Sequence, residues 1–350
     1  MRPVTQILFV LVLVVALVGP AAAQDVPNPT DVLAVKPDVP AGERSVGWHP
    51  LLKASATFSF SHNQDVVGTP DGISWILGGI INGGVDYVGK GGHFWLNTLK
   101  WDLSFSKTPL LDEMVKSLDN FEFESTYIYQ IPKMTWWGPY GNVKVKTAIL
   151  PGYLLFTDPT SVATLGSDGA LMGEISQPKG RLNLTDAFAP TTLRESLGLW
   201  ADPVRTVPFT LQTRLGLGAW EVFTRGGFNP ADDVLTTDVF EVKQMQDSVQ
   251  LGGEVRVVMK GVYKEFISYQ AKAEFMYPFY SSFVPTNNDG SDMAGIELMN
   301  TEFEFLLGFK LASWVSLDYT MKAYRLPLLS PEWQIQNGLL LTLTANIVGK

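Results

Sequence analysis

Residues suited to acid–base or nucleophilic chemistry are few in this 350-residue sequence, which has three histidines and no cysteine. A hydrolytic site needs a nucleophile within hydrogen-bond reach of its base. Ser59 and Ser61 precede His62, but in an extended strand their side chains point to the face opposite that of His62. His49 falls in a linker-like region, and His93 directly follows a turn. We therefore predict no catalytic residues.

Two polar segments of the sequence contain residues that could bind a cation. TNNDGSDMAG, residues 286–295, has some of the residues of a calcium-binding loop, but their spacing is wrong and the closing glutamate is missing. ADD, residues 231–233, is a weaker candidate. The sequence has no phosphate-binding loop, dinucleotide fingerprint or zinc motif. We predict no metal and no cofactor.

Charged residues instead recur at alternate positions of apolar segments, where they would share one face of a strand. If the apolar face meets lipid, the charged face lines an interior, or lumen. The candidate lumen-lining residues are Lys100, Asp102, Glu122, Glu124, Lys144, Lys146, Arg214, Glu254, Arg256, Lys260, Lys272, Glu274, Glu302, Glu304, Lys310, Asp318 and Lys322.

About twelve segments show this alternation of apolar and polar residues. KASATFSFSH, for example, places Ala and Phe on one face and Ser and Thr on the other. The Thr192–Trp200 segment is weaker, because Glu195 interrupts its apolar face. The predicted strands are 53–62, 73–87, 95–106, 121–131, 143–153, 192–200, 207–220, 249–263, 267–279, 299–311, 315–325 and 333–348.

The length of these segments indicates what they face. Many have 11 or more residues, whereas strands of soluble proteins usually have about 5–6 and transmembrane strands about 9–11. Short connections, near 89–92, 202–204, 261–264 and 312–313, alternate with longer ones. We predict an all-β fold, a closed antiparallel transmembrane up-and-down β-barrel of about 12 strands. A secreted soluble β-sandwich is the alternative.

Opposite charges meet at three predicted hairpins. Such pairing suits a filled, salt-bridged interior and also a narrow polar pore, since about twelve strands lie between filled small barrels and open large ones. The expected neighbours are Glu122 opposite Lys146, Glu124 opposite Lys144, Glu254 diagonal to Lys272, Arg256 diagonal to Glu274, and Lys322 beside Glu302 and Glu304.

Aromatic residues gather near the predicted strand ends, as interfacial girdles require. Some of them would be there simply because aromatics favour strands. The girdle candidates are Trp75, Trp95, Trp136, Trp137, Tyr140, Tyr153, Trp200, Trp220, Tyr277, Tyr280, Trp314 and Trp333.

The N-terminal residues predict export. Arg2, the apolar run ILFVLVLVVALVG and the small residues AAA indicate a signal peptide over 1–23, with an uncleaved anchor as the alternative. Residues 24–47 read as a Pro-rich periplasmic linker and 48–350 as the barrel. The formal net charge of −9 argues against a nucleic-acid partner.

Three stretches, GGIINGGVDYVGKGGHFWLNTLKWDLSFS, FEFESTYIYQI and VKVKTAILPGY, followed by APTTLRESLGLW, resemble a family of bacterial outer-membrane β-barrels known as a domain of unknown function. The resemblance spans roughly 47–200 and implies a barrel in the bacterial outer membrane, with no activity or site residues. The implied partners are outer-membrane lipid and the barrel-assembly machinery. The ending NIVGK departs from the aromatic terminus that this machinery reads.

Three functions follow as hypotheses. The first is a passive pore, transport or structural role for an outer-membrane barrel with a charged, partly salt-bridged lumen. The second is an outer-membrane lipid-hydrolysing enzyme that uses His62, and the third is a secreted soluble β protein. The sequence does not define an oligomeric state.

Overall fold

The computed structural model of the chain describes residues 45–63, 72–109, 111, 113–231, 239–264, 266–285, 291–312, 314–328 and 330–348. The predicted signal peptide and nearly all of the predicted linker lie outside the described residues, as do residues 286–290 of the calcium-like stretch. No helix in the described part of the chain is long and apolar enough to cross a membrane.

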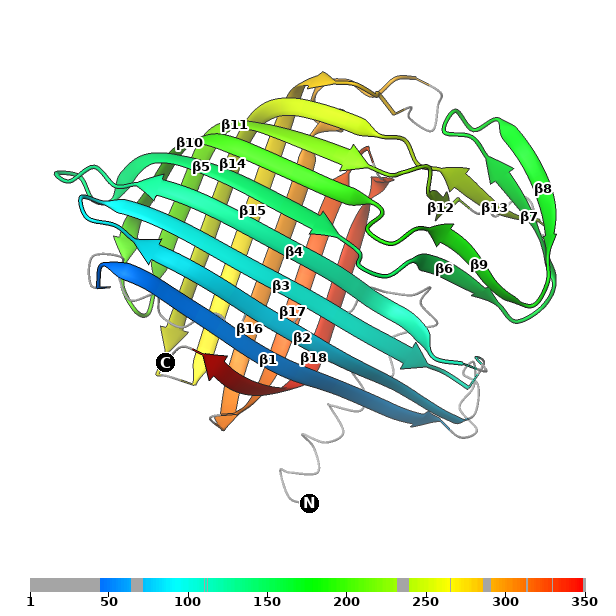
Figure 1. Cartoon of the computed structure of the whole chain (residues 1–350), viewed down its shortest axis with the longest axis horizontal. Helices are drawn as coiled ribbons and strands as arrows, with labels where there is room; N and C mark the ends of the chain where they lie inside the picture. Colours follow the sequence, from blue (N-terminus) through cyan, green and yellow to red (C-terminus); the bar gives the residue numbers. More distant parts are fainter. Residues whose placement is uncertain are drawn as a thin grey trace, which may run out of the picture.

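Twelve antiparallel strands form one closed barrel, in the order β1-β18-β17-β16-β15-β14-β11-β10-β5-β4-β3-β2 (Figure 1). Each pairs with its neighbour in the chain order, apart from the two places where smaller strands intervene. The barrel strands are β1 (Gly47–Asn63), β2 (Gly72–Val88), β3 (His93–Lys107), β4 (Val115–Tyr129), β5 (Trp137–Thr147), β10 (Thr191–Arg205), β11 (Thr210–Phe223), β14 (Ser248–Tyr263), β15 (Ile267–Ser281), β16 (Asn300–Ala312), β17 (Val315–Leu326) and β18 (Ser330–Val348).

The predicted closed barrel is confirmed, and each of the twelve predicted segments overlaps one barrel strand. Closure comes from pairing of the first strand with the last, with Ala54 opposite Ala345 and Ala56 opposite Leu343. Because every strand then has two partners, the barrel has no open sheet edge. The alternation in sequence has a direct structural meaning, since successive side chains point inward and outward.

Two insertions form small sheets beyond one end of the barrel (Figure 1). β6 (Gly152–Phe156) pairs with β9 (Gly180–Thr185), and a four-stranded sheet has the order β12-β13-β7-β8. In that sheet β12 is Phe228–Pro230, β13 Val239–Gln244, β7 Thr160–Leu165 and β8 Leu171–Gln177. The two small sheets contact each other through the rings of Phe156 in β6 and Phe240 in β13, whose centroids are 5.4 Å apart.

These insertions correct one predicted boundary. The segment 143–153 was expected to be a single strand, but β5 ends at Thr147 and Tyr153 belongs to β6. Pro151 stands between the two strands and lacks the N–H that a central ladder needs. The first insertion is tied to the β3–β4 loop by Arg181, which donates to both carboxylate oxygens of Glu113 at 2.9 and 2.8 Å.

The tight turns lie together at the other end of the barrel. One predicted turn, Asp202–Val204, is instead an irregularity within the β10–β11 pairing, and the chain reverses after Arg205. Pro203 accounts for the difference, because a residue without an N–H fits a bulge as well as a turn.

A glycine pair allows a close backbone contact between β10 and β11. Gly198 lies directly opposite Gly216, and a Cβ on Gly198 would lie 2.5 Å from the Cα of Gly216. Only residues without side chains allow the two backbones to approach this closely on the inner side. The neighbouring residues Leu197 and Leu217 are exposed on the outer side.

Candidate functional site: the barrel interior

Five basic and five acidic side chains meet inside the barrel in what we call the ion-pair layer. Its members are Lys144, Arg194, Arg214, Arg256, Lys272, Glu122, Glu124, Glu274, Glu302 and Glu304. All come from inward-facing positions of β4, β5, β10, β11, β14, β15 and β16. Their exposed side-chain fractions are at most 25%.

Glu124 of β4 contacts side chains from strands that are not its neighbours in the barrel wall. Its Oε1 lies 3.3 Å from Nη1 of Arg214 and 3.2 Å from Nη1 of Arg256. In the strand order, β11, β10 and β5 separate β14 from β4, so the contact between Arg256 and Glu124 passes through the interior. Arg256 also holds Glu274 at 3.0 Å.

Arg194 of β10 makes a second bridge through the interior. It donates to Glu274 of β15 at 3.4 Å and to Glu302 of β16. Its guanidinium lies 3.7 Å from the centroid of the Trp220 ring, a cation–π distance. A cavity beside Arg194, Trp220 and Glu254 measures about 30 Å³, which is room for about two water molecules.

Arg194 was not among the predicted lumen residues. The signal was present, because Arg194 alternates with Leu193 and Glu195 and shares the parity of Ser196. Glu195 interrupts the apolar face of the same segment, so the alternation that marks Arg194 as inward-facing is weaker there.

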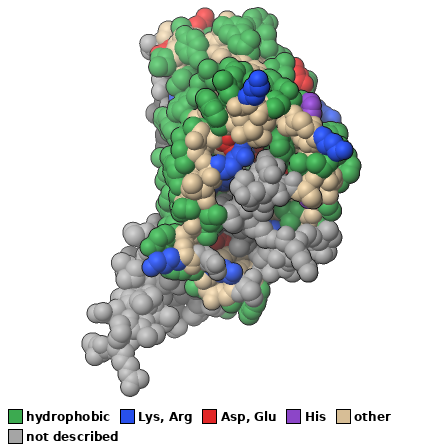
Figure 2. Space-filling view, turned by 90° about the vertical axis from the view of Figure 1, so that its left-hand side faces the viewer, with side chains coloured by type: hydrophobic (Ala, Val, Ile, Leu, Met, Phe, Trp, Pro, Cys, Tyr) green, Lys and Arg blue, Asp and Glu red, His purple; other side chains and the backbone are tan. Residues whose placement is uncertain are grey.

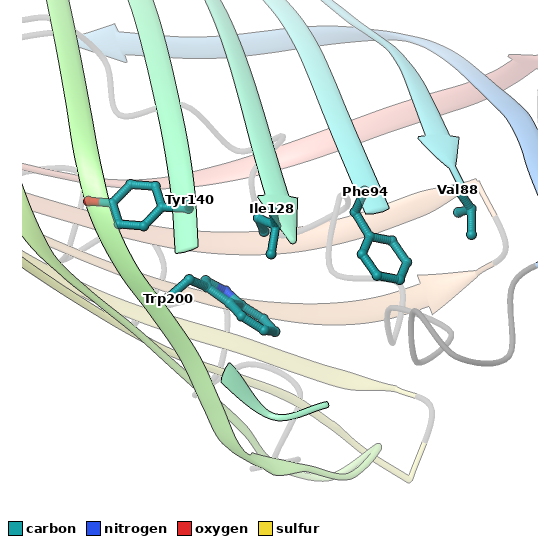
Figure 3. Close-up of a cluster of buried hydrophobic side chains, with 5 residues drawn as sticks. All are labelled: Val88, Phe94, Ile128, Tyr140 and Trp200. Carbon is teal, nitrogen blue, oxygen red and sulfur yellow. The ribbon is translucent and has the colours of Figure 1, made fainter. Parts of the chain in front are cut away.

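Apolar clusters lie on the inner wall on either side of the ion-pair layer. The turn-end cluster joins Val88, Phe94, Ile128, Tyr140 and Trp200 from five successive strands, β2, β3, β4, β5 and β10 (Figure 3). The loop-end cluster joins Trp220, Val222, Met276 and Leu326. The interior is therefore layered, with charges between two apolar zones.

Three girdle candidates were assigned to the wrong face. Tyr140, Trp200 and Trp220 are each only 4% exposed and lie in the interior clusters. Tyr140, Trp200 and Trp220 are an even number of positions from inward Lys144, Arg194 and Arg214 on their own strands, so they face inward too. Proximity to a strand end does not report this. Trp95, Trp136, Tyr277, Tyr280, Trp314 and Trp333 are exposed.

The predicted register of the β4–β5 hairpin is confirmed, although its close ion pair differs, and the predicted register of the β14–β15 hairpin is wrong. Glu122 lies opposite Lys146 and Glu124 opposite Lys144, but the close pair is the diagonal one, Lys144 to Glu122 at 3.1 Å. Arg256 is directly opposite Glu274 rather than diagonal to it.

The third hairpin places Lys322 directly opposite Glu304. Lys272, expected to be near Glu254, contacts Glu274 at 3.1 Å and Glu304 at 3.8 Å instead. Glu304 lies directly opposite Lys272 on β16, whereas on β14 Lys272 lies opposite Val258 and Glu254 lies opposite Met276. The register therefore keeps Lys272 away from Glu254.

The remaining predicted lumen residues are not among the ten members of the ion-pair layer named above. Asp102 and Asp318 are buried, 1% and 0% exposed, and Asp318 is hydrogen-bonded to Ser316 at 2.7 Å. Lys100 shares a register row with Glu122. Lys146 is exposed, and Lys260 and Lys310 stand near the turn end of the barrel, where Lys310 is exposed.

The candidate catalytic and metal residues are not brought together. His93 Nδ1 lies 2.6 Å from the Tyr127 hydroxyl, and His49 Nε2 bonds to the Ser45 carbonyl at 2.8 Å. His62 belongs to β1, and its side chain lies outside the described residues. Within those residues, no three His, Asp or Glu side chains are grouped to hold a metal ion.

The outer wall contrasts with the interior. Exposed large hydrophobic residues such as Leu77, Leu199 and Leu341 occupy positions that alternate with the inward ones. Figure 2 shows hydrophobic side chains gathered at the top and along the left-hand side of one face, with several Lys, Arg, Asp and Glu side chains elsewhere on it.

The sequence model of a family described as "Protein of unknown function (DUF3078)" matches residues 70–153. These residues include all of β2 to β5 and the start of β6. The resemblance expected from the sequence to a family of unknown function is thus confirmed over this part of the chain. No curated protein matches the sequence.

Several solved outer-membrane structures are similar in overall form. The translocator domain of the autotransporter NalP from Neisseria meningitidis shares 9% identity at a TM-score of 0.37, covering 89% of this chain and 92% of that one. The COG4313 outer membrane channel from Pseudomonas putida F1 gives 9% and 0.37, with coverage of 89% and 98%. At such low values, the fold rests on the strand pairing of this chain itself.

Proposed function

We propose that this protein is an integral barrel of the bacterial outer membrane with an interior closed to solutes, and that its role is structural. The observation that carries the proposal is the ion-pair layer, in which Arg256 and Arg194 reach carboxylates on distant walls. The apolar outer wall and charged interior support a membrane location, because charges facing lipid are costly.

In this proposal the barrel acts as an anchor for the two small sheets at its loop end. Lipid on the outer wall and the barrel-assembly machinery are its expected partners, and cleavage of residues 1–23 precedes assembly. No catalytic step forms part of the proposed role.

Conductance of the purified protein in a planar lipid bilayer tests this function. We expect no step conductance from the wild type. The double variant Glu124→Gln/Arg194→Gln, which removes the two cross-lumen bridges, should show measurable steps if it retains strand content by circular dichroism. Regular steps from the wild-type protein would support the passive-pore role and overturn the closed one.

A further inference from the structure

The outer wall carries one feature that neither an anchor nor a pore requires. Glu195 is exposed on the outside of β10, because Arg194 and Ser196 on either side of it point inward. Leu193 and Leu197 are its neighbours on the same face. Among the described residues Glu195 has no hydrogen-bond or ion-pair partner. A carboxylate facing lipid needs compensation from outside the chain.

Glu195 stands at the side of a groove of about 360 Å³ in the outer wall. Strand register places Ser125 and Glu195 on either side of Val143, and Tyr127 and Leu197 on either side of Gly141. Gly141 has no side chain, and a Cβ there would lie 3.1 Å from Cδ2 of Leu197. Gly141 therefore forms the floor of the groove beside Leu197, and a larger side chain at this position would take up part of its space. The volume of the groove is at the lower end for small-molecule sites.

One wall of the groove is fixed in place. The Ser125 hydroxyl accepts from the Trp95 indole N–H at 2.8 Å and donates to the Asn97 amide oxygen at 2.8 Å. Asn97 in turn donates to the Val85 carbonyl at 2.9 Å. These bonds hold polar groups rigidly on a face that is otherwise apolar.

The groove lies at the end of a row of aromatic side chains. Trp48, Tyr87, Trp95 and Tyr127 occupy successive positions of one register row, and Gly141 is the next. The ring centroids of Trp48 are 4.9 Å from Tyr87 and 6.0 Å from Trp95. Aromatic rows of this kind mark the head-group level of membrane barrels.

We propose that this groove binds the ammonium head group of a zwitterionic phospholipid of the phosphatidylethanolamine class, an inference that rests on the proposed membrane location. Glu195 supplies the negative charge and accepts hydrogen bonds from the ammonium, which has three N–H donors. The Tyr127 ring borders the same space, where it attracts a cation. A trimethylated choline head group has no N–H to donate and binds less well.

Native mass spectrometry of the detergent-purified full-length protein, titrated with phosphatidylethanolamine or phosphatidylcholine of identical acyl chains, tests this site. The wild type should retain at least fivefold more phosphatidylethanolamine. Glu195→Gln should lose that preference, and Gly141→Val, which fills the groove without altering charge, should lose binding at this site. Glu221→Gln is the matched control, because Glu221 also faces outward but does not line the groove.

Equal retention of the two lipids by the wild type, or an unchanged preference in Glu195→Gln, overturns the inference. The inference is also overturned if the wild type binds a second copy of the chain instead of lipid and Glu195→Gln releases that copy. Flotation with vesicles is measured on the same preparations. Failure to float defeats the proposed membrane function, whereas flotation without lipid preference defeats the head-group site alone.

Discussion

Glu124 is the residue at which two arginines from neighbouring strands converge, and its loss should weaken the barrel. Glu124→Gln leaves Arg214 and Arg256 without a shared counter-charge in a poorly solvated interior. Removing one partner of a buried ion pair typically costs about 3–5 kcal/mol. We expect a clear fall in the urea midpoint of the detergent-solubilised barrel.

Lys310→Gln is the control for that experiment, since Lys310 is exposed near the turn end of β16. Exposed substitutions usually change stability by less than about 0.5 kcal/mol. Equal urea midpoints for Glu124→Gln and the control would show that the ion-pair layer contributes little to stability.

Asp247, in the connection before β14, should make local stability depend on pH. The Thr224 backbone N–H and hydroxyl donate to its Oδ1 at 2.6 and 2.8 Å, and these bonds hold the pKa of Asp247 below its ordinary value. The stabilisation is therefore present above the unfolded pKa, about 4, and is lost as pH falls through the lower folded value. Asp247→Ala should speed hydrogen exchange at 224–227 at pH 7, and the difference from wild type should shrink at pH 2.

Individual interior residues were predictable from parity, and individual contacts were not. Alternation indicated that Glu124 and Arg256 both face the interior. Their ion pair depends on barrel closure, which brings together strands that are far apart in the sheet order. No local pattern encodes which charge on the far wall a long arginine will reach.

At the level of the elements, the close contact of β10 and β11 at Gly198 and Gly216 can be tested by adding a side chain. Gly198→Ala introduces a Cβ against the Gly216 backbone, and overpacking of this kind costs about 1–3 kcal/mol. We expect a lower urea midpoint than for wild type. Gly253→Ala is the control, because a Cβ there meets nothing within 4 Å. Indistinguishable midpoints for the two variants would mean that the β10 and β11 backbones move apart easily at this contact.

The strands were predictable because their length and period-two pattern persist through most of the chain. The two small sheets were not predicted, because β6 to β9, β12 and β13 have only 3–7 residues each. In addition, the four-stranded sheet combines strands from both insertions. β13 even pairs in parallel with β7, over 70 positions away in the sequence. Such pairing has no signature at the level of a single segment.

For the whole molecule, barrel and insertions should be separable. Thr147 of β5 already pairs with Thr191 of β10, and Val222 of β11 with Ser248 of β14. Replacing residues 150–188 and 225–246 with short glycine-containing turns should therefore leave all twelve barrel strands paired. The shortened protein should retain heat-modifiable migration on gels. Loss of that migration would indicate that the outer sheets are needed to assemble the barrel.

Closure through β1 and β18 has a kinetic consequence. The two strands that seal the barrel lie at opposite ends of the folded chain, so the seam has the longest loop to close and should form late in folding. Until it forms, the facing edges of β1 and β18 display unpaired backbone groups that could join another chain. The barrel is then most exposed to aggregation while the β1–β18 seam is open, when the eleven other strand pairings can already be in place.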